Sequence, residues 1–394
     1  MANQKNRVTS NLGSLNDTES VTGLVSRNDR FKVYRFRLND RSSLTGTLGV
    51  LTSGNADLEL LNGDRQRIAK SNMPGDDSIT QNLNAGIYFL RVTQRSGNTN
   101  FSLTLSGEPL KLFGLTEQNT LVAFNADNLN AVNVGSVTGL AAGETLVGID
   151  FRATTATVNG QSLNGTLYGV GSTNRLYTIN TATGQATQVG TTPFAPGLDG
   201  TFFGVDFNPS PDRIRLVSNN DQNLRLVPDG AITPTGTPAP AGTVADSNTT
   251  VTGIQTDSPP LLTYITGDTN AGHNPNVVAT AYANNRPGGR VTQFVIDADL
   301  DILARQGSSG GAATSPGGSP NGGLLATIGA LGFDFGNTTA FDISTDSNLA
   351  DTAIATSGST LYGINLATGA AKNLGIVTVN GTAVNLVGIS TRVI

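Results

Sequence analysis

The sequence predicts an all-β protein in which an N-terminal β-sandwich is followed by a β-propeller. Glycine supplies 48 of the 394 residues, and Gly and Asn provide the positive φ angles of tight turns. Charged residues make up only 13%, against roughly 25% in an average soluble protein, so the composition does not suit long helices. Short segments of alternating apolar and polar residues recur between the turns, which is the pattern of half-buried strands.

The sandwich is predicted over residues 21–107. Residues 1–20 are polar and show no periodicity, so we expect a flexible lead-in there. From Phe31 to Leu38 the residues alternate between apolar and polar, and five further short segments follow between Gly, Asn and Asp turns. Short strands at this spacing are typical of a β-sandwich.

The same region resembles a known bacterial family. The segment from Leu83 to Val92, LNAGIYFLRV, has the pattern L-x-A-G-x-Y-x-x-x-V. In this pattern and in the order of its strand segments, the region is similar to the pre-peptidase C-terminal (PPC) domain. The resemblance implies an accessory module of a secreted enzyme or surface protein, and therefore export.

Residues 108–394 contain an internal repeat. The stretch from Leu167 to Gly190 is partly repeated from Leu361 to Gly375, and the region divides into four units of four strand-like segments. Two of the segments so assigned are Ala231–Gly236, ending the second unit, and Pro260–Asp268, opening the third. Repeats of this length are typical of propeller blades.

Two fragments complete a predicted fifth blade. The region opens with three strands, and the chain ends with a single one, NLVGIS. A final strand that joins the first three closes a ring and leaves few open edges. A six-bladed ring would need a blade hidden in the irregular third repeat. The Gly/Ser/Pro-rich segment 305–323 is expected to be a disordered-type surface loop.

This half of the chain also resembles a family. The segments LDGTFFGVDFNPSPDRIRLVSNNDQNLRL and GDTNAGHNPNVVATAYANN are similar to the bacterial DUF4394 proteins. The resemblance implies a propeller-like repeat fold and an extracellular setting. It implies no activity.

Composition excludes several classes of function. The net charge is −5, and the absence of a basic run argues against nucleic-acid binding. The absence of cysteine excludes disulfides and thiolate zinc sites. No segment has the length of a membrane span, and no apolar signal-peptide region is visible. The expected location, extracellular or at the cell surface, therefore depends on the family resemblances.

One loop has the side chains of a binding site. Asp268, Asn270, His273 and Asn274 lie within the ten residues Gly267–Asn276, and carboxylate and amide oxygens suit Ca²⁺ or sugar hydroxyls. The alternative is a long turn whose side chains cap their own backbone. No catalytic motif accompanies His273, the only histidine, so we assign no catalytic residue.

Three acidic residues repeat at one blade position. Asp150, Asp206 and Asp342 occupy the same place in three predicted first strands, and Ser390 takes it in the closing strand. First strands line the channel of a propeller, so the carboxylates are candidate metal ligands. Alternatively, each carboxylate accepts bonds from backbone N–H groups of the next blade. In the sandwich, Asp57 is a further candidate ligand, and Ca²⁺ is the candidate cofactor.

The favoured function is a non-catalytic, extracellular or cell-surface binding or structural protein that uses the propeller as an interaction platform. Its partner would be a protein or a polysaccharide, and self-association is open. One alternative is a hydrolase or lyase that acts on a polar polymer at the propeller face, which would require His273 and a carboxylate in one cleft. Another is a self-assembling sheath or filament subunit.

Overall fold

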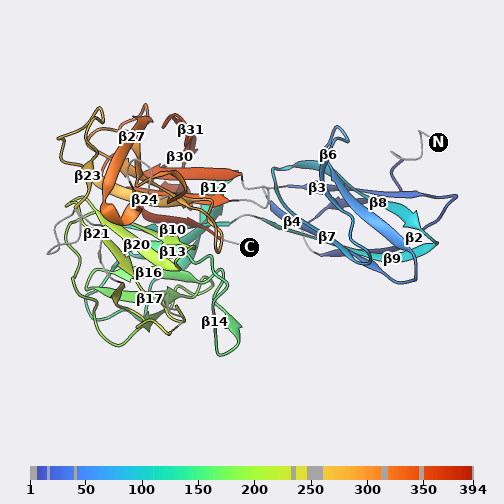
Figure 1. Ribbon diagram of the computed structural model, residues 1–394, viewed down its shortest axis with the longest axis horizontal. Helices are drawn as coiled ribbons and strands as arrows, with labels where there is room; N and C mark the ends of the chain where they lie inside the picture. The colour runs from blue at the N-terminus through green and yellow to red at the C-terminus, as the bar shows by residue number, and fades with distance from the viewer. Residues whose placement is uncertain are drawn as a thin grey trace. The chain divides into compact units, whose positions relative to one another are not determined.

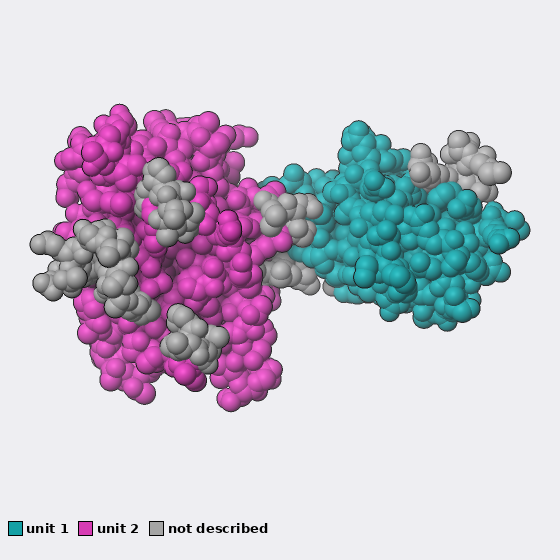
Figure 2. All heavy atoms as spheres, in the orientation of Figure 1, with its two compact units in different colours: residues 1–110, 125–127, 346–348 teal, residues 111–124, 128–345, 349–394 magenta. Residues whose placement is uncertain are grey.

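The computed structural model describes residues 7–15, 18–39, 42–109, 111–231, 237–245, 261–311, 318–345 and 350–392, and its fold is all-β (Figure 1). Within these ranges the only helical elements are two 3₁₀ turns, η1 (Ser309–Gly311) and η2 (Pro320–Gly322). No helix in the described ranges is long and apolar enough to span a membrane. The chain divides into two compact units, mainly residues 1–110 (unit 1) and mainly residues 111–394 (unit 2) (Figure 2).

Unit 1 is a sandwich of two sheets that share one core. The first sheet has the order β1 (Ser10–Ser14), β3 (Phe31–Leu38), β8 (Gly86–Ser96), β5 (Asn55–Leu61), β6 (Arg67–Ser71). The second has the order β2 (Glu19–Val25), β9 (Thr99–Pro109), β4 (Ser42–Val50), β7 (Asp77–Leu83). Alternate residues point inward because the side-chain period of a strand is two, and Phe36, Leu58 and Leu90 of the first sheet pack with Leu48 and Leu103 of the second.

The prediction of a flexible segment over residues 1–20 is wrong for part of that range. Residues Ser10–Ser14 form β1, which pairs in parallel with β3, and β2 begins at Glu19. The sequence SNLGS has no apolar alternation. The strand β1 lies at the edge of its sheet, where backbone hydrogen bonds hold it. Side-chain periodicity therefore could not reveal it.

Unit 2 contains five larger sheets in the described ranges, each built on a four-stranded meander. One has the order β34 (Leu386–Thr391), β10 (Lys111–Thr116), β11 (Thr120–Asn125), β12 (Asn128–Ser136), extended by β32 (Thr378–Val379) and β33 (Thr382–Ala383). The next two are β13 (Leu146–Phe151), β16 (Leu167–Gly171), β17 (Arg175–Ile179), β18 (Ala186–Val189), and β19 (Phe203–Asn208), β20 (Arg213–Ser218), β21 (Asn223–Leu226), β22 (Val244–Ala245). The last two are β24 (Val277–Ala283), β25 (Thr292–Asp297), β26 (Ile302–Gln306), β27 (Leu324–Ala330), β23 (Thr263–Tyr264), and β28 (Thr339–Thr345), β29 (Asp351–Ser357), β30 (Thr360–Ile364), β31 (Ala371–Ile376).

The first strand of each meander contacts the first strand of the next one, and the contacts close a cycle. We call β13, β19, β24, β28 and β34 the inner strands. In this order each lies against its successor, and β34 lies against β13. The last inner strand is the C-terminal one, and it pairs antiparallel with β10, the first strand of unit 2. The first sheet of unit 2 is therefore completed by the C-terminal strand. This agrees with the prediction that the single last strand joins the three strands that open the region.

The third repeat differs from the prediction. Pro260–Asp268 was expected to be its first strand, but β24 is the inner strand and the short β23 pairs in parallel with β27 at the outer edge. The strand β27 was missed because it follows the Gly-rich segment. Within the segment predicted as a loop, 305–323, Arg305 and Gln306 belong to β26, and η1 and η2 follow; residues 312–317 lie outside the described residues.

The fourth strand of the second repeat is also displaced from its expected place. Ala231–Gly236 was predicted there, but the strand that pairs with β21 is β22, Val244–Ala245. Residues 232–236 lie outside the described residues. A short apolar and Thr-rich segment does not by itself say which of two nearby candidates will pair.

The repeated motif corresponds to the same local structure in two sheets. Each copy contains the hairpin turn that joins the third strand to the fourth: β17 to β18 and β30 to β31. The turn glycines Gly184 and Gly369 have φ angles of 74° and 83°, a region that glycine enters without steric cost.

Candidate functional site

Three inner strands each place one aspartate at the centre of unit 2. Asp150 lies on β13, Asp206 on β19 and Asp342 on β28, and all three are buried, with 1–3% of their surface exposed. One carboxylate oxygen of each lies within 4.8 Å of the other two. The structure thus brings together three of the four metal candidates that the sequence singles out. We call these three side chains the aspartate cluster.

Each aspartate also accepts a hydrogen bond from the backbone of a neighbouring inner strand. Asp150 accepts from the N–H of Phe207 at 2.7 Å. Asp206 accepts from Tyr282 at 3.2 Å, and Asp342 accepts from Thr391 at 2.7 Å. These bonds link successive inner strands side by side, which is the structural role weighed against metal binding.

The two remaining inner strands carry smaller side chains at the same level. On β34, the hydroxyl of Ser390 donates to Asp150 at 2.6 Å and accepts from the N–H of Phe151 at 3.0 Å. On β24 the corresponding residue is Ala281, which directly precedes the donor Tyr282. The ring of polar side chains therefore has one apolar position.

Burial raises the pKa values of the cluster. Burial, together with the charge of Asp342, raises the pKa of Asp150 well above its usual range. Burial and the charges of Asp150 and Asp342 do the same to the pKa of Asp206. Burial raises the pKa of Asp342 to about 6, against the hydrogen bonds from Thr391 and Ile343, which lower it. Without a cation, three negative charges at this separation are unfavourable.

Small residues lie just above the aspartates and let the inner strands approach closely. Two residues before each acid or its equivalent come Gly148, Gly204, Ala279, Ala340 and Gly388. A Cβ atom on Gly204 would lie 2.5 Å from the backbone nitrogen of Thr280 on the next strand. A cavity of about 10 Å³ remains at this level, which is about the space of one water molecule.

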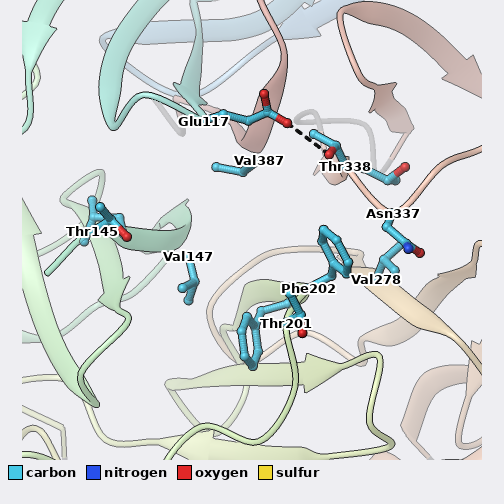
Figure 3. Close-up of a pocket in the computed structure, with 12 residues that line it drawn as sticks. Glu117, Thr145, Val147, Thr201, Phe202, Val278, Asn337, Thr338 and Val387 are labelled. Atoms are coloured by element: carbon cyan, nitrogen blue, oxygen red, sulfur yellow. Dashed lines mark hydrogen bonds between the residues drawn. The ribbon is translucent and has the colours of Figure 1, made fainter.

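A wider cavity opens where the inner strands begin, and we call it the mouth. It has a volume of about 250 Å³ and shares Phe203, Thr339 and Val387 with the narrow cavity. Figure 3 shows Glu117, Val147, Phe202, Val278 and Asn337 around it. The exposed carboxylate of Glu117 accepts from the Thr338 hydroxyl at 3.1 Å and from the Asn385 amide at 3.2 Å.

The loop of residues 267–276 does not join the aspartate cluster. The carboxylate of Asp268 accepts from the backbone N–H and the hydroxyl of Thr327 at 2.8 and 2.6 Å, and from the N–H of Asn270 at 2.9 Å. Burial acts to raise the pKa of Asp268, but these hydrogen bonds outweigh it and lower that pKa. His273 and Asn274 are exposed, and neither lines the mouth or the narrow cavity.

Asp57, the fourth metal candidate, lies in unit 1 and is ion-paired. It is 1% exposed and bonds Lys70 at 3.0 Å and the Nε of Arg95 at 2.6 Å. Burial acts to raise the pKa of Asp57, and the bonds and charges of Arg95 and Lys70 outweigh it and lower that pKa. Its Oδ2 atom therefore already has two cationic partners.

The residues of the mouth were not found from the sequence. Glu117 follows β10, and Phe202 and Thr338 directly precede inner strands, so they share a position at strand ends but no motif. Only their place relative to the repeats could have indicated them. Ligand-binding side chains often lie at strand ends or in the loops next to them.

Several solved structures resemble parts of the chain at low identity. The pre-peptidase C-terminal domain of collagenase from Bacillus anthracis has 15% identity and a TM-score of 0.23, with 25% of this chain and 97% of that chain covered. A protein of unknown function from Bacteroides caccae has 11% identity and a TM-score of 0.32, with 69% of this chain and 74% of that chain covered. Apo AztD from Citrobacter koseri has 10% identity and a TM-score of 0.28, with 89% of this chain and 98% of that chain covered. None of these likenesses carries a conclusion about function.

The family comparison covers most of unit 2. No curated protein matches the chain significantly. The model of the domain of unknown function DUF4394 matches residues 120–390. This range includes the aspartate cluster, nearly all of the inner strands and every lining residue of the mouth except Glu117, and the chain therefore belongs to the DUF4394 family.

Proposed function

We propose that unit 2 is a five-bladed β-propeller and that the protein is a non-catalytic, extracellular binding protein which recognises a polar polymer at the mouth. The observation that carries this proposal is the composition of the mouth. Residues at the starts of the inner strands line it, namely Val147, Phe203, Val278, Thr339 and Val387. Clefts at such convergence points are common ligand sites.

The chemistry of the mouth suits a neutral, hydrogen-bonding group. The carboxylate of Glu117, the amide of Asn337 and the hydroxyls of Thr145, Thr201 and Thr338 provide donors and acceptors, and Phe202 adds an aromatic face. The volume of about 250 Å³ is below the usual range for drug-sized ligands. It matches one sugar ring or one large side chain, so we infer that the mouth holds a single unit of a longer chain.

A hydrolase or lyase activity finds no support in the described residues. His273 is exposed on its loop, whereas the aspartate cluster is buried. A general acid and base must reach the same substrate atoms. The mouth itself contains one carboxylate, Glu117, and no histidine.

An extracellular setting rests on the resemblance of both halves of the chain to exported proteins. Bacterial surface polysaccharides and surface proteins are the polymers available there. We therefore expect the partner among these two classes.

The test is binding of the full-length protein to an array of bacterial polysaccharide fragments, followed by calorimetric titration of each hit. Phe202→Ala and Glu117→Gln should each weaken binding at least tenfold, since they remove the aromatic face and the charged acceptor. Gln188→Ala, an exposed change on β18 away from the mouth, is the control. Binding that survives both mouth variants would refute the site.

The same preparation also tests for catalysis and for self-assembly. Bond cleavage of a bound fragment would identify an enzyme, and large concentration-dependent assemblies in light scattering would identify a sheath or filament subunit. A monomer that binds fragments without cleaving them is the expected result.

A further inference from the structure

No basic side chain offsets the charge that the aspartate cluster has when its carboxylates are ionised. None of the ion pairs found in the described ranges includes Asp150, Asp206 or Asp342. Isolated buried carboxylates are costly, and proteins pair them, protonate them or use them to bind metals. The remaining question is whether protons or a cation neutralise this cluster.

The separation of the carboxylates matches the dimensions of a single metal site. Calcium–oxygen distances are about 2.3–2.6 Å, so ligands on opposite sides of one ion lie about 4.6–5.2 Å apart and neighbouring ligands lie closer. The three ligand oxygens here lie within 4.8 Å of one another. The spacing is therefore compatible with one ion that contacts all three.

A second, independent observation points to a missing ligand. Asp206 is 1% exposed, and its Oδ2 atom has no hydrogen-bond partner. An unsatisfied carboxylate oxygen in the interior costs more than any neutral polar group. It belongs to the side chain that faces Asp150 and Asp342, whose charges act on it. This oxygen is free to accept a metal bond.

We propose that Asp150, Asp206 and Asp342 bind one calcium ion, which ties the inner strands β13, β19 and β28 together at the centre of unit 2. The ligands are all oxygens, which suit hard cations and not softer metals such as zinc or copper. The adjoining cavity of about 10 Å³ leaves little room for bound water. Mg²⁺ gives up its waters reluctantly, whereas Ca²⁺ accepts protein oxygens in flexible geometry.

The mouth and the narrow cavity provide the route for the ion. They share Phe203, Thr339 and Val387, and the narrow cavity is lined by residues that directly precede the cluster, such as Ile149, Val205 and Phe341. The ion would thus reach the carboxylates along the axis of the inner strands. Its role is structural and goes beyond ligand recognition at the mouth.

Calorimetry of the full-length protein tests the proposal. The protein is unfolded thermally in EDTA, then after removal of EDTA with excess CaCl₂ or MgCl₂. Since Ca²⁺ binds only the folded cluster, a 100-fold excess over Kd should raise the midpoint of unit 2 by about 5–10 °C, and Mg²⁺ should raise it less. Unit 1, whose Asp57 is already ion-paired, should not respond and serves as an internal reference. Elemental analysis of dialysed wild-type protein should find one calcium per chain.

Three variants locate the ion. Asp206→Asn, which keeps an acceptor for Tyr282, should abolish both the midpoint shift and the retained calcium, and Asp342→Asn should do the same. Asp268→Asn, which changes an acid in the loop 267–276, is the matched control and should retain both. No retained calcium and no shift in the wild type would overturn the proposal. So would a response that persists in both cluster variants or disappears only in Asp268→Asn, because the ion would then lie elsewhere. If Asp206→Asn does not fold, the wild-type stoichiometry and Asp342→Asn decide.

Discussion

Two sets of buried acids, one in each unit, differ in their partners. In unit 1, Asp57 pairs with Lys70 and Arg95, and Glu59 pairs with Arg91. In unit 2, the three acids of the aspartate cluster face one another without a basic partner. The charges of Asp57 and Glu59 are therefore compensated within the folded chain, whereas the aspartate cluster needs protons or a cation. The difference indicates where this protein depends on its surroundings.

The largest expected loss of stability is in unit 1, the sandwich. Arg91→Met leaves the carboxylate of Glu59 buried without its main partner, whose Nε donates to it at 2.8 Å. Removing one member of a buried pair costs about 3–5 kcal/mol. The midpoint of unit 1 should fall in calorimetry while that of unit 2 stays. Adding Glu59→Gln to the variant should restore most of the loss, and an unchanged midpoint in the single variant would contradict the comparison.

The second largest effect is expected from a substitution that forces two inner strands apart by a steric clash. In Gly204→Ala the new Cβ would lie 2.5 Å from the backbone nitrogen of Thr280, and the inner strands would have to separate. Overpacking of this kind costs about 2–3 kcal/mol, measured as a lower midpoint of unit 2 alone. Gly336→Ala is the matched control, because a Cβ there meets nothing within 4 Å. Equal midpoints for the two variants would show that the strands can move apart freely.

A pair of identical substitutions sharpens the contrast between the units. In EDTA, Asp57→Asn should destabilise unit 1 by about 2 kcal/mol, because it removes a buried charge that has partners. Asp206→Asn should leave the stability of unit 2 unchanged or slightly higher, because it removes a buried charge that has no basic partner. Denaturant titration of both variants measures the two changes. Losses of equal size would mean that the cluster is as well compensated as the sandwich pair.

The smallest effect concerns Asp221, an acid of unit 2 outside the cluster. Burial and the charge of Asp297 raise the pKa of Asp221 to about 6, and its buried Oδ1 has no hydrogen-bond partner. The folded state then holds a proton that the unfolded chain releases above about pH 4, so the stability present below pH 4 is lost as the pH rises through 6.

Asp221→Asn removes this loss and should raise the midpoint of unit 2 by roughly 1–2 °C at pH 7. Near pH 4 the variant and the wild type should coincide. Asn also tolerates the positive φ of 60° at this position. Thermal scans between pH 4 and pH 7 measure the difference, and an equal gain at both ends would rule out the titration of Asp221 as its cause.

Much of the fold and part of the candidate site could be predicted from local patterns. Alternation in Phe31–Leu38 and the four-strand repeats predicted strands that the structure contains, and the motif NLVGIS predicted the strand that closes the first sheet of unit 2. The equivalence of Asp150, Asp206 and Asp342 was visible because repeats align by sequence alone. The edge strand β1 and the strand β27 could not be predicted from the sequence, because their pairing depends on backbone hydrogen bonds and on the strands that lie beside them.

The sequence by itself determined the all-β class, the order of most strands and the shared position of three aspartates, because strand period, turn residues and repeats are local properties. Only the tertiary structure decided that these aspartates meet within 4.8 Å, that Asp57 is instead ion-paired and that His273 lies apart from them. It also created the mouth, whose residues come from separate strand ends. Such distances arise when five sheets close on one another, and no single segment of the chain contains that information.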